Sequence, residues 1–139
     1  MKSIVTAFAL AVALLAPTAP SATASNALHL DFEKSIVDPA GVWAGTVSGD
    51  IEGALRTELR SLTERGHLRL VTFDWIVDAG EESFVARLDG TLNTKNGRVA
   101  MRGRVIEGAY LGARVQEHGR LVDAATQTFR GSIRIMPAS

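Results

Sequence analysis

The stretch from residue 99 to residue 121 most constrains how this chain can fold. Both of its halves alternate apolar with polar residues, and arginines fill many of the polar positions. The apolar positions are Val99, Met101, Val105, Ala113, Val115 and Leu121. A period of two with one apolar face is typical of a β-strand that is buried on one side. The stretch therefore predicts two strands joined by a turn over residues 107–112.

Further alternating runs share the chain with turn signals rich in Gly, Asp and Asn. The predicted strands cover residues 28–33, 42–48, 67–77, 83–92, 98–107, 113–122 and 129–136. No proline occurs between Pro39 and Pro137, and central strands exclude proline. Short strands at this spacing are typical of an all-β sandwich or barrel.

Residues 53–65 fit two interpretations. Leu55, Leu59 and Leu62 have helical spacing, and Gly66 is well placed to end a helix. The same segment also alternates apolar and charged residues as a strand would. The pattern leaves helix and strand open.

Glycines inside the predicted strands indicate a small closed barrel rather than a flat sandwich. They are Gly49, Gly90, Gly103, Gly119 and Gly131. A glycine within a strand is tolerated where a sheet coils tightly or another backbone comes close. A barrel inserted in a membrane is disfavoured, because its outer face would carry arginines that each cost about 2–4 kcal/mol at mid-bilayer. We expect no stable membrane insertion.

The N-terminus predicts a signal peptide at residues 1–24. Lys2 precedes an apolar run over residues 4–16, and the small residues Ala22 and Ala24 suit a cleavage site. That run is shorter than the roughly 20 residues that span a bilayer. The expected product is a secreted protein, extracellular or periplasmic, with one domain over residues 25–139.

Composition excludes several classes of function for that domain. The chain has no cysteine, which rules out disulfides and cysteine metal sites. Without Lys2, one more acidic than basic residue remains, so no net charge attracts nucleic acid. His29, His67 and His118 lack the spacing of a metal site, and we expect no metal.

The segment 67–77 is apolar on both faces. Leu68, Leu70 and Ile76 lie on one face, and the other carries Val71, Phe73, Trp75 and Val77. A closed barrel buries only one face in its lumen, so the other needs a cover. We expect a second subunit to cover the face that carries Phe73 and Trp75, which gives a homo-oligomer.

The candidate catalytic residues are Asp74, Glu117 and Tyr110. If the parity of Leu70 faces the lumen, Asp74 is a carboxylate in an apolar cavity, suited to acid–base catalysis. Otherwise Phe73 faces inward and Asp74 lies on the surface. Glu117 shares the parity of buried residues and is either a second such group or the structural partner of an arginine.

Aromatic residues are the candidates for ligand binding. They would line the lumen or its mouth together with Met101, and Tyr110 would offer a hydroxyl from the turn over 107–112. The expected ligand-binding residues are Trp43, Phe73, Trp75, Met101 and Tyr110. The alternative is that they are ordinary core residues.

Four glycine-containing segments resemble the bacterial allene-oxide-cyclase-like barrel proteins. They cover residues 42–50, 88–93, 103–113 and 129–135. The resemblance implies an eight-stranded antiparallel, calycin-like barrel with a hydrophobic interior, and it favours a strand over 53–62. It also implies cofactor-free cyclisation or isomerisation of an apolar substrate.

Three hypotheses for the function follow. The first is a secreted barrel that binds a small hydrophobic molecule, the second is a cofactor-free cyclase or isomerase, and the third is a filled barrel that acts through its surface. The binding barrel and the cyclase both need a lumen cavity of about 300 Å³ or more, whereas a filled barrel has no such cavity.

Overall fold

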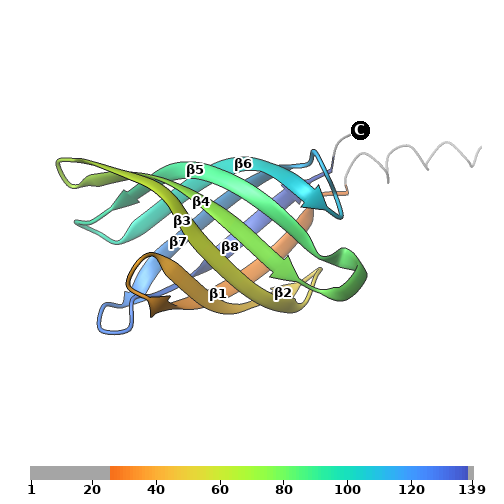
Figure 1. Cartoon of the computed structure of the whole chain (residues 1–139), viewed down its shortest axis with the longest axis horizontal. Coiled ribbons are helices and arrows are strands. Elements are labelled where there is room, and N and C mark those ends of the chain that lie inside the picture. Colours follow the sequence, from red (N-terminus) through yellow and green to blue (C-terminus); the bar gives the residue numbers. More distant parts are fainter. Residues whose placement is uncertain (1–25, 138–139) are drawn as a thin grey trace, which may run out of the picture.

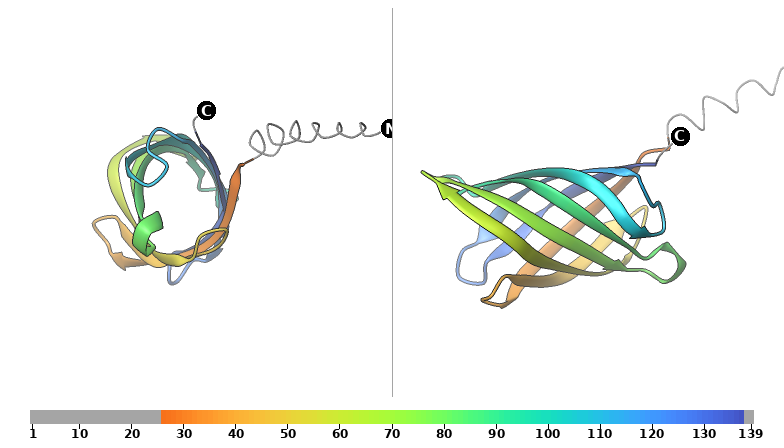
Figure 2. Two further views of the ribbon diagram at one scale, coloured as in Figure 1. Left: turned by 90° about the vertical axis from the view of Figure 1, so that its right-hand side faces the viewer. Right: turned by 45° about the horizontal axis from the view of Figure 1, so that its top comes forward.

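Eight antiparallel strands close into one barrel in the computed structural model, which describes residues 26–137 (Figure 1). The strands are β1 (Leu28–Asp38), β2 (Val42–Gly49), β3 (Gly53–Arg65), β4 (Leu68–Asp78), β5 (Phe84–Asn93), β6 (Arg98–Gly108), β7 (Arg114–Asp123) and β8 (Thr128–Met136). Each strand pairs with the next, and β1 pairs with β8 to complete the ring that Figure 2 shows end-on. The expected all-β, closed, eight-stranded antiparallel barrel is confirmed.

A short 3₁₀ turn, η2 (Gly80–Glu82), joins β4 to β5. Across residues 26–137, no helix has the length and apolar character to cross a membrane. The predicted signal peptide lies outside the described residues, so cleavage and export stay predictions.

The ambiguous segment 53–65 is a strand. Residues 53–58 pair with β2 along one edge, and residues 54–65 pair with β4 along the other, so strand pairing satisfies backbone groups along the whole segment. Its alternation has a direct structural cause, because Leu55 and Thr57 point into the barrel and are buried while Arg56 is exposed.

Glycines within the strands allow neighbouring backbones to approach closely. A Cβ atom on Gly103 would meet the carbonyl oxygen of Arg87 on β5, and one on Gly90 would meet that of Ala100 on β6. A Cβ atom on Gly131 would likewise meet the carbonyl oxygen of His118 on β7. These positions fit the tight coiling that a closed barrel of this size requires.

The lumen face of β4 carries the aromatic residues. Phe73 and Trp75 are buried inside the barrel, and Trp75 packs edge-on against Phe32 of β1 with ring centroids 5.0 Å apart. Leu68, Leu70 and Ile76 lie partly exposed on the outer wall. The interpretation of the Trp75 face as a subunit contact is therefore wrong, because a monomer already covers it. A homo-oligomer stays a prediction without that support.

The outer wall of β6, β7 and β8 is rich in arginine. Seven exposed arginines lie there: Arg98, Arg102, Arg104, Arg114, Arg120, Arg130 and Arg134. The strand register places Arg120 directly opposite Arg98 on one side and opposite Arg130 on the other. The charges of this near-neutral chain are thus unevenly distributed over its surface.

Candidate functional site

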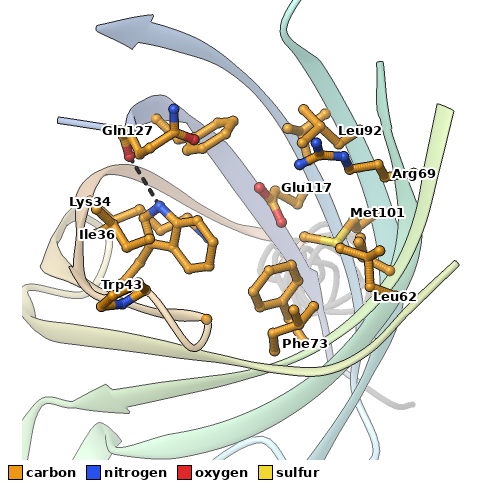
Figure 3. Close-up of a pocket in the computed structure, with 16 residues that line it drawn as sticks. Lys34, Ile36, Trp43, Leu62, Arg69, Phe73, Leu92, Met101, Glu117 and Gln127 are labelled. Atoms are coloured by element: carbon orange, nitrogen blue, oxygen red, sulfur yellow. Dashed lines mark hydrogen bonds between the residues drawn. The ribbon is translucent and has the colours of Figure 1, made fainter. Parts of the chain in front are cut away.

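A cavity of about 310 Å³ occupies one half of the lumen. It lies at the end where hairpins connect β1 to β2, β3 to β4, β5 to β6 and β7 to β8 (Figure 1). Most of its lining is apolar: Ile36, Pro39, Trp43, Leu59, Leu62, Val71, Phe73, Leu92, Val99, Met101 and Phe129. The side chains of Lys34, Arg69, Glu117 and Gln127 add polar groups (Figure 3). The opposite half of the lumen is filled by buried side chains, so the barrel is closed at that end.

Trp43 forms part of the cavity wall and is held in place by its indole nitrogen and by two neighbouring aromatic rings. Its indole N–H donates a hydrogen bond of 3.0 Å to the backbone carbonyl oxygen of Gln127, drawn in Figure 3. Its ring packs edge-on against Phe73 and Phe129, with centroids 5.5 and 6.2 Å away. The bond ties the start of β2 to the β7–β8 hairpin at the open end of the barrel, which holds Trp43 in the cavity wall.

Lys34 is a buried amine that lies among four aromatic rings. It projects inward from β1 and its Nζ donates a hydrogen bond of 3.2 Å to Oγ1 of Thr57. Four ring centroids lie 5.0–5.8 Å from Nζ, those of Phe32, Trp43, Phe73 and Trp75. Burial lowers the pKa of Lys34, and the charge of Glu117 offsets part of that effect. Lys34 was not among the residues expected from the sequence.

Glu117 is a buried acid that also lines the cavity. Its side chain projects inward from β7 and is 1% exposed. Its Oε1 atom has no hydrogen-bond partner among the described residues. Burial raises the pKa of Glu117 to about 7, while the charge of Lys34 acts in the opposite direction. The buried position matches the inward interpretation of Glu117, and the electrostatic partner is a lysine rather than the expected arginine.

Lys34 and Glu117 influence each other without forming a close ion pair. The ion pairs of residues 26–137 do not include one between these two side chains. The Lys34 amine donates one hydrogen bond to Thr57 and has further N–H groups to donate. Oε1 of Glu117 is an acceptor without a donor among the described residues. A molecule in the cavity can therefore meet both an amine and a carboxyl group.

Asp74 lies on the outer wall, and the interpretation of Asp74 as a lumen acid is corrected. Arg87 on β5 donates two hydrogen bonds to its carboxylate, of 2.8 and 3.1 Å, and Arg60 lies 3.6 Å away. The hydrogen bond from Arg87 lowers the pKa of Asp74, which keeps it ionised. The cause is the orientation of β4, which turns Phe73 and Trp75 inward and Asp74 outward.

Tyr110 lies at the opposite end of the barrel from the cavity. It lies in the β6–β7 connection at the closed end of the barrel, and its hydroxyl donates a hydrogen bond of 2.9 Å to Glu82. That hydrogen bond raises the pKa of Tyr110. It is not among the lining residues, so neither the expected catalytic nor the expected ligand-binding role of Tyr110 has support from its position.

The other expected residues divide into two groups. Trp43, Phe73 and Met101 line the cavity, as a ligand-binding role requires. Trp75 does not line it but lies below, fully buried, with its ring 5.0 Å from the Lys34 amine. Among the described residues, no group of three or more His, Cys, Asp or Glu side chains is arranged to hold a metal.

The signal for Lys34 was present in the sequence. Leu30, Phe32, Lys34 and Ile36 share one parity of β1, so a lysine interrupts an otherwise apolar face. A lysine on a buried parity is rare and requires a compensating partner.

No known family model, curated protein or solved structure matches this chain.

Proposed function

We propose that this protein binds a small hydrophobic molecule in the open half of its lumen. The observation that carries the proposal is the cavity itself, whose volume and mostly apolar lining suit such a ligand. Lys34 and Glu117 would meet the ligand's polar group, and the aromatic walls would hold its apolar body. The filled-barrel hypothesis is less favoured, because the lumen is packed in only one half.

Two further parts of the proposal rest on the sequence. The segments that resemble allene-oxide-cyclase-like proteins support a calycin-like barrel of that type. The N-terminal pattern supports export, so the ligand would be met outside the cytoplasm. Native mass spectrometry of the protein purified from its own host would identify a retained ligand directly.

Binding can be tested with the apolar fluorescent probe N-phenyl-1-naphthylamine. We expect its emission to rise and shift to the blue on addition of the protein, with energy transfer from Trp43 and Trp75, which both lie in the lumen. Val99→Trp should fill the cavity from its β6 side and abolish the signal, since Val99 belongs to the lining. Val122→Trp, on an exposed position of β7, is the matched control and should bind normally. Equal binding by both variants would refute a lumen site.

A cofactor-free cyclase or isomerase is the second candidate. The observation that favours it is Glu117, a buried carboxyl group with a free oxygen at the cavity and a pKa near neutrality. Such a group can take and return a proton in a water-poor site. Glu117→Gln should then still bind the probe. It should no longer exchange deuterium from D₂O into the ligand that the protein retains when it is purified from its own host. Exchange that persists in Glu117→Gln would argue for a binding protein alone.

A further inference from the structure

We propose that Lys34 forms a reversible Schiff base with an apolar aldehyde or ketone bound in the lumen. This inference rests on the proposed function, because it names the class of ligand and the atom that holds it. Three features carry it: an amine that borders an apolar cavity, a ring of aromatic faces around that amine, and a carboxyl group at the same cavity.

The aromatic faces around Lys34 suit a cation on its nitrogen. Four rings lie within 5.8 Å of Nζ, a distance at which a ring face attracts a positive charge. A protonated imine on the same nitrogen keeps that charge and adds an apolar substituent. The cage that accommodates the ammonium therefore also accommodates the product, and the substituent extends into the cavity.

The amine must lose a proton before it can attack a carbonyl carbon. Burial favours the neutral form of Lys34, and burial also favours the protonated form of Glu117. Imine formation needs a neutral amine and a proton donor, and burial shifts the two groups of this cavity in that direction. Desolvation in an apolar pocket is a known way to activate a lysine for this chemistry.

The reaction balances without an oxidant or reductant. The Nζ lone pair attacks the carbonyl carbon, a C–N bond forms, the C=O π bond breaks, and a proton passes from nitrogen to oxygen to give a carbinolamine. Glu117 then protonates the hydroxyl group, the C–O bond breaks, and water leaves. The products are a protonated imine on Lys34, the carboxylate of Glu117 as its counter-ion, and one water molecule.

The chain provides an internal control for selectivity. Lys95 is the other lysine of residues 26–137, and it is exposed in the turn between β5 and β6. Solvent, rather than an aromatic cage, surrounds it. A reagent that reacts by lumen binding should label Lys34, and one that reacts by simple exposure should label Lys95.

The test is reductive trapping of the purified protein with trans-cinnamaldehyde and sodium cyanoborohydride, followed by peptide mass mapping. We expect the adduct on Lys34 to form at least tenfold faster than on Lys95. Glyceraldehyde, a polar aldehyde, should show the reverse preference. Labelling of Lys95 and the N-terminus without Lys34 would overturn the inference. The wild-type chain suffices for this comparison, so no variant needs to fold.

Variants separate the Schiff base from simple binding. Glu117→Gln should slow adduct formation on Lys34 at least tenfold, while Lys95→Arg should leave it unchanged. Lys34→Met should give no adduct in the lumen. If the wild type binds the naphthylamine probe but yields no Lys34 adduct, the Schiff base is refuted and lumen binding stands. If neither occurs, both proposals fail.

Discussion

Lys34 and Glu117 are both buried in the lumen, and the charge of each shifts the pKa of the other. Neither has a full set of partners, since Lys34 has one hydrogen bond to Thr57 and Oε1 of Glu117 has none within the part of the chain described. Burying ionisable groups in this way costs stability unless they are well paired. Burial of the two side chains therefore lowers the stability of the barrel.

The first prediction is a pH dependence of stability caused by Glu117. Its pKa is about 7 in the folded chain against an ordinary 4.5, so the folded state holds an extra proton between these values. The free energy of unfolding should then fall as pH rises from about 4.5 to 7, by on the order of 3 kcal/mol. Urea unfolding of the wild type and of Glu117→Gln over this range measures it. A constant difference between the two proteins would contradict the raised pKa.

The second prediction concerns removal of both charges. Replacing a buried charge pair by apolar or neutral groups of similar size is often neutral or stabilising. The double variant Lys34→Met/Glu117→Gln should therefore be at least as stable as the wild type at pH 8. Lys34→Met alone should be less stable there by about 3 kcal/mol, because it leaves an uncompensated buried carboxylate. A double variant that is less stable than both single variants would show that the pair holds the fold together.

The architecture was predictable because strands carry their signal in every second residue. In β7 the inward residues Val115 and Leu121 are apolar and the outward residues Arg114, Gln116 and Arg120 are polar, which identifies the buried face even though Glu117 also lies on it. In β4 both faces are apolar, and alternation alone could not show which one is the lumen. The expected subunit contact put the Trp75 face outside, while the alternative put Phe73 inside and Asp74 on the surface. The structure decides for the alternative, with Trp75 buried in the lumen.

The site was predictable only in part, because it depends on contacts between distant strands. Glu117, Trp43, Phe73 and Met101 were expected at a lumen site and line the cavity. Lys34 was missed although it interrupts the apolar face of β1, and its aromatic neighbours could not be predicted because they come from three strands. Which half of the lumen stays open also depends on side-chain packing, and strand patterns contain no such information.

The third prediction tests the close approach of strands at Gly103. A side chain there would meet the backbone of Arg87, which cannot move without disturbing the β5–β6 pairing. Gly103→Val should lower the free energy of unfolding by about 1–3 kcal/mol through overpacking. Gly66→Asn is the control, because Gly66 has open space around it and asparagine tolerates its φ of 63°. Chemical denaturation of both variants distinguishes crowding from a general intolerance of glycine replacement.

The fourth prediction follows from the opposed arginines on the outer wall. Arg120 lies directly across from Arg98 and Arg130, and like charges in directly opposed positions destabilise a sheet. Arg130 has an acidic partner, Glu33, at 2.8 Å, so the repulsion of Arg120 is greatest toward Arg98. Arg120→Glu should therefore stabilise the barrel at low ionic strength by roughly 0.5–1 kcal/mol. Thermal unfolding in about 10 mM salt measures this gain.

Salt provides the check that charge, rather than packing, causes the effect. About 0.3 M sodium chloride shortens the screening length below the separation of many surface charges, so it should raise the melting temperature of the wild type more than that of Arg120→Glu. Arg65→Glu is the matched control: Arg65 is also an exposed strand arginine, but it lies opposite Leu68 rather than another arginine. If Arg65→Glu gains as much stability as Arg120→Glu, the benefit comes from net charge and the opposed arginines contribute nothing specific.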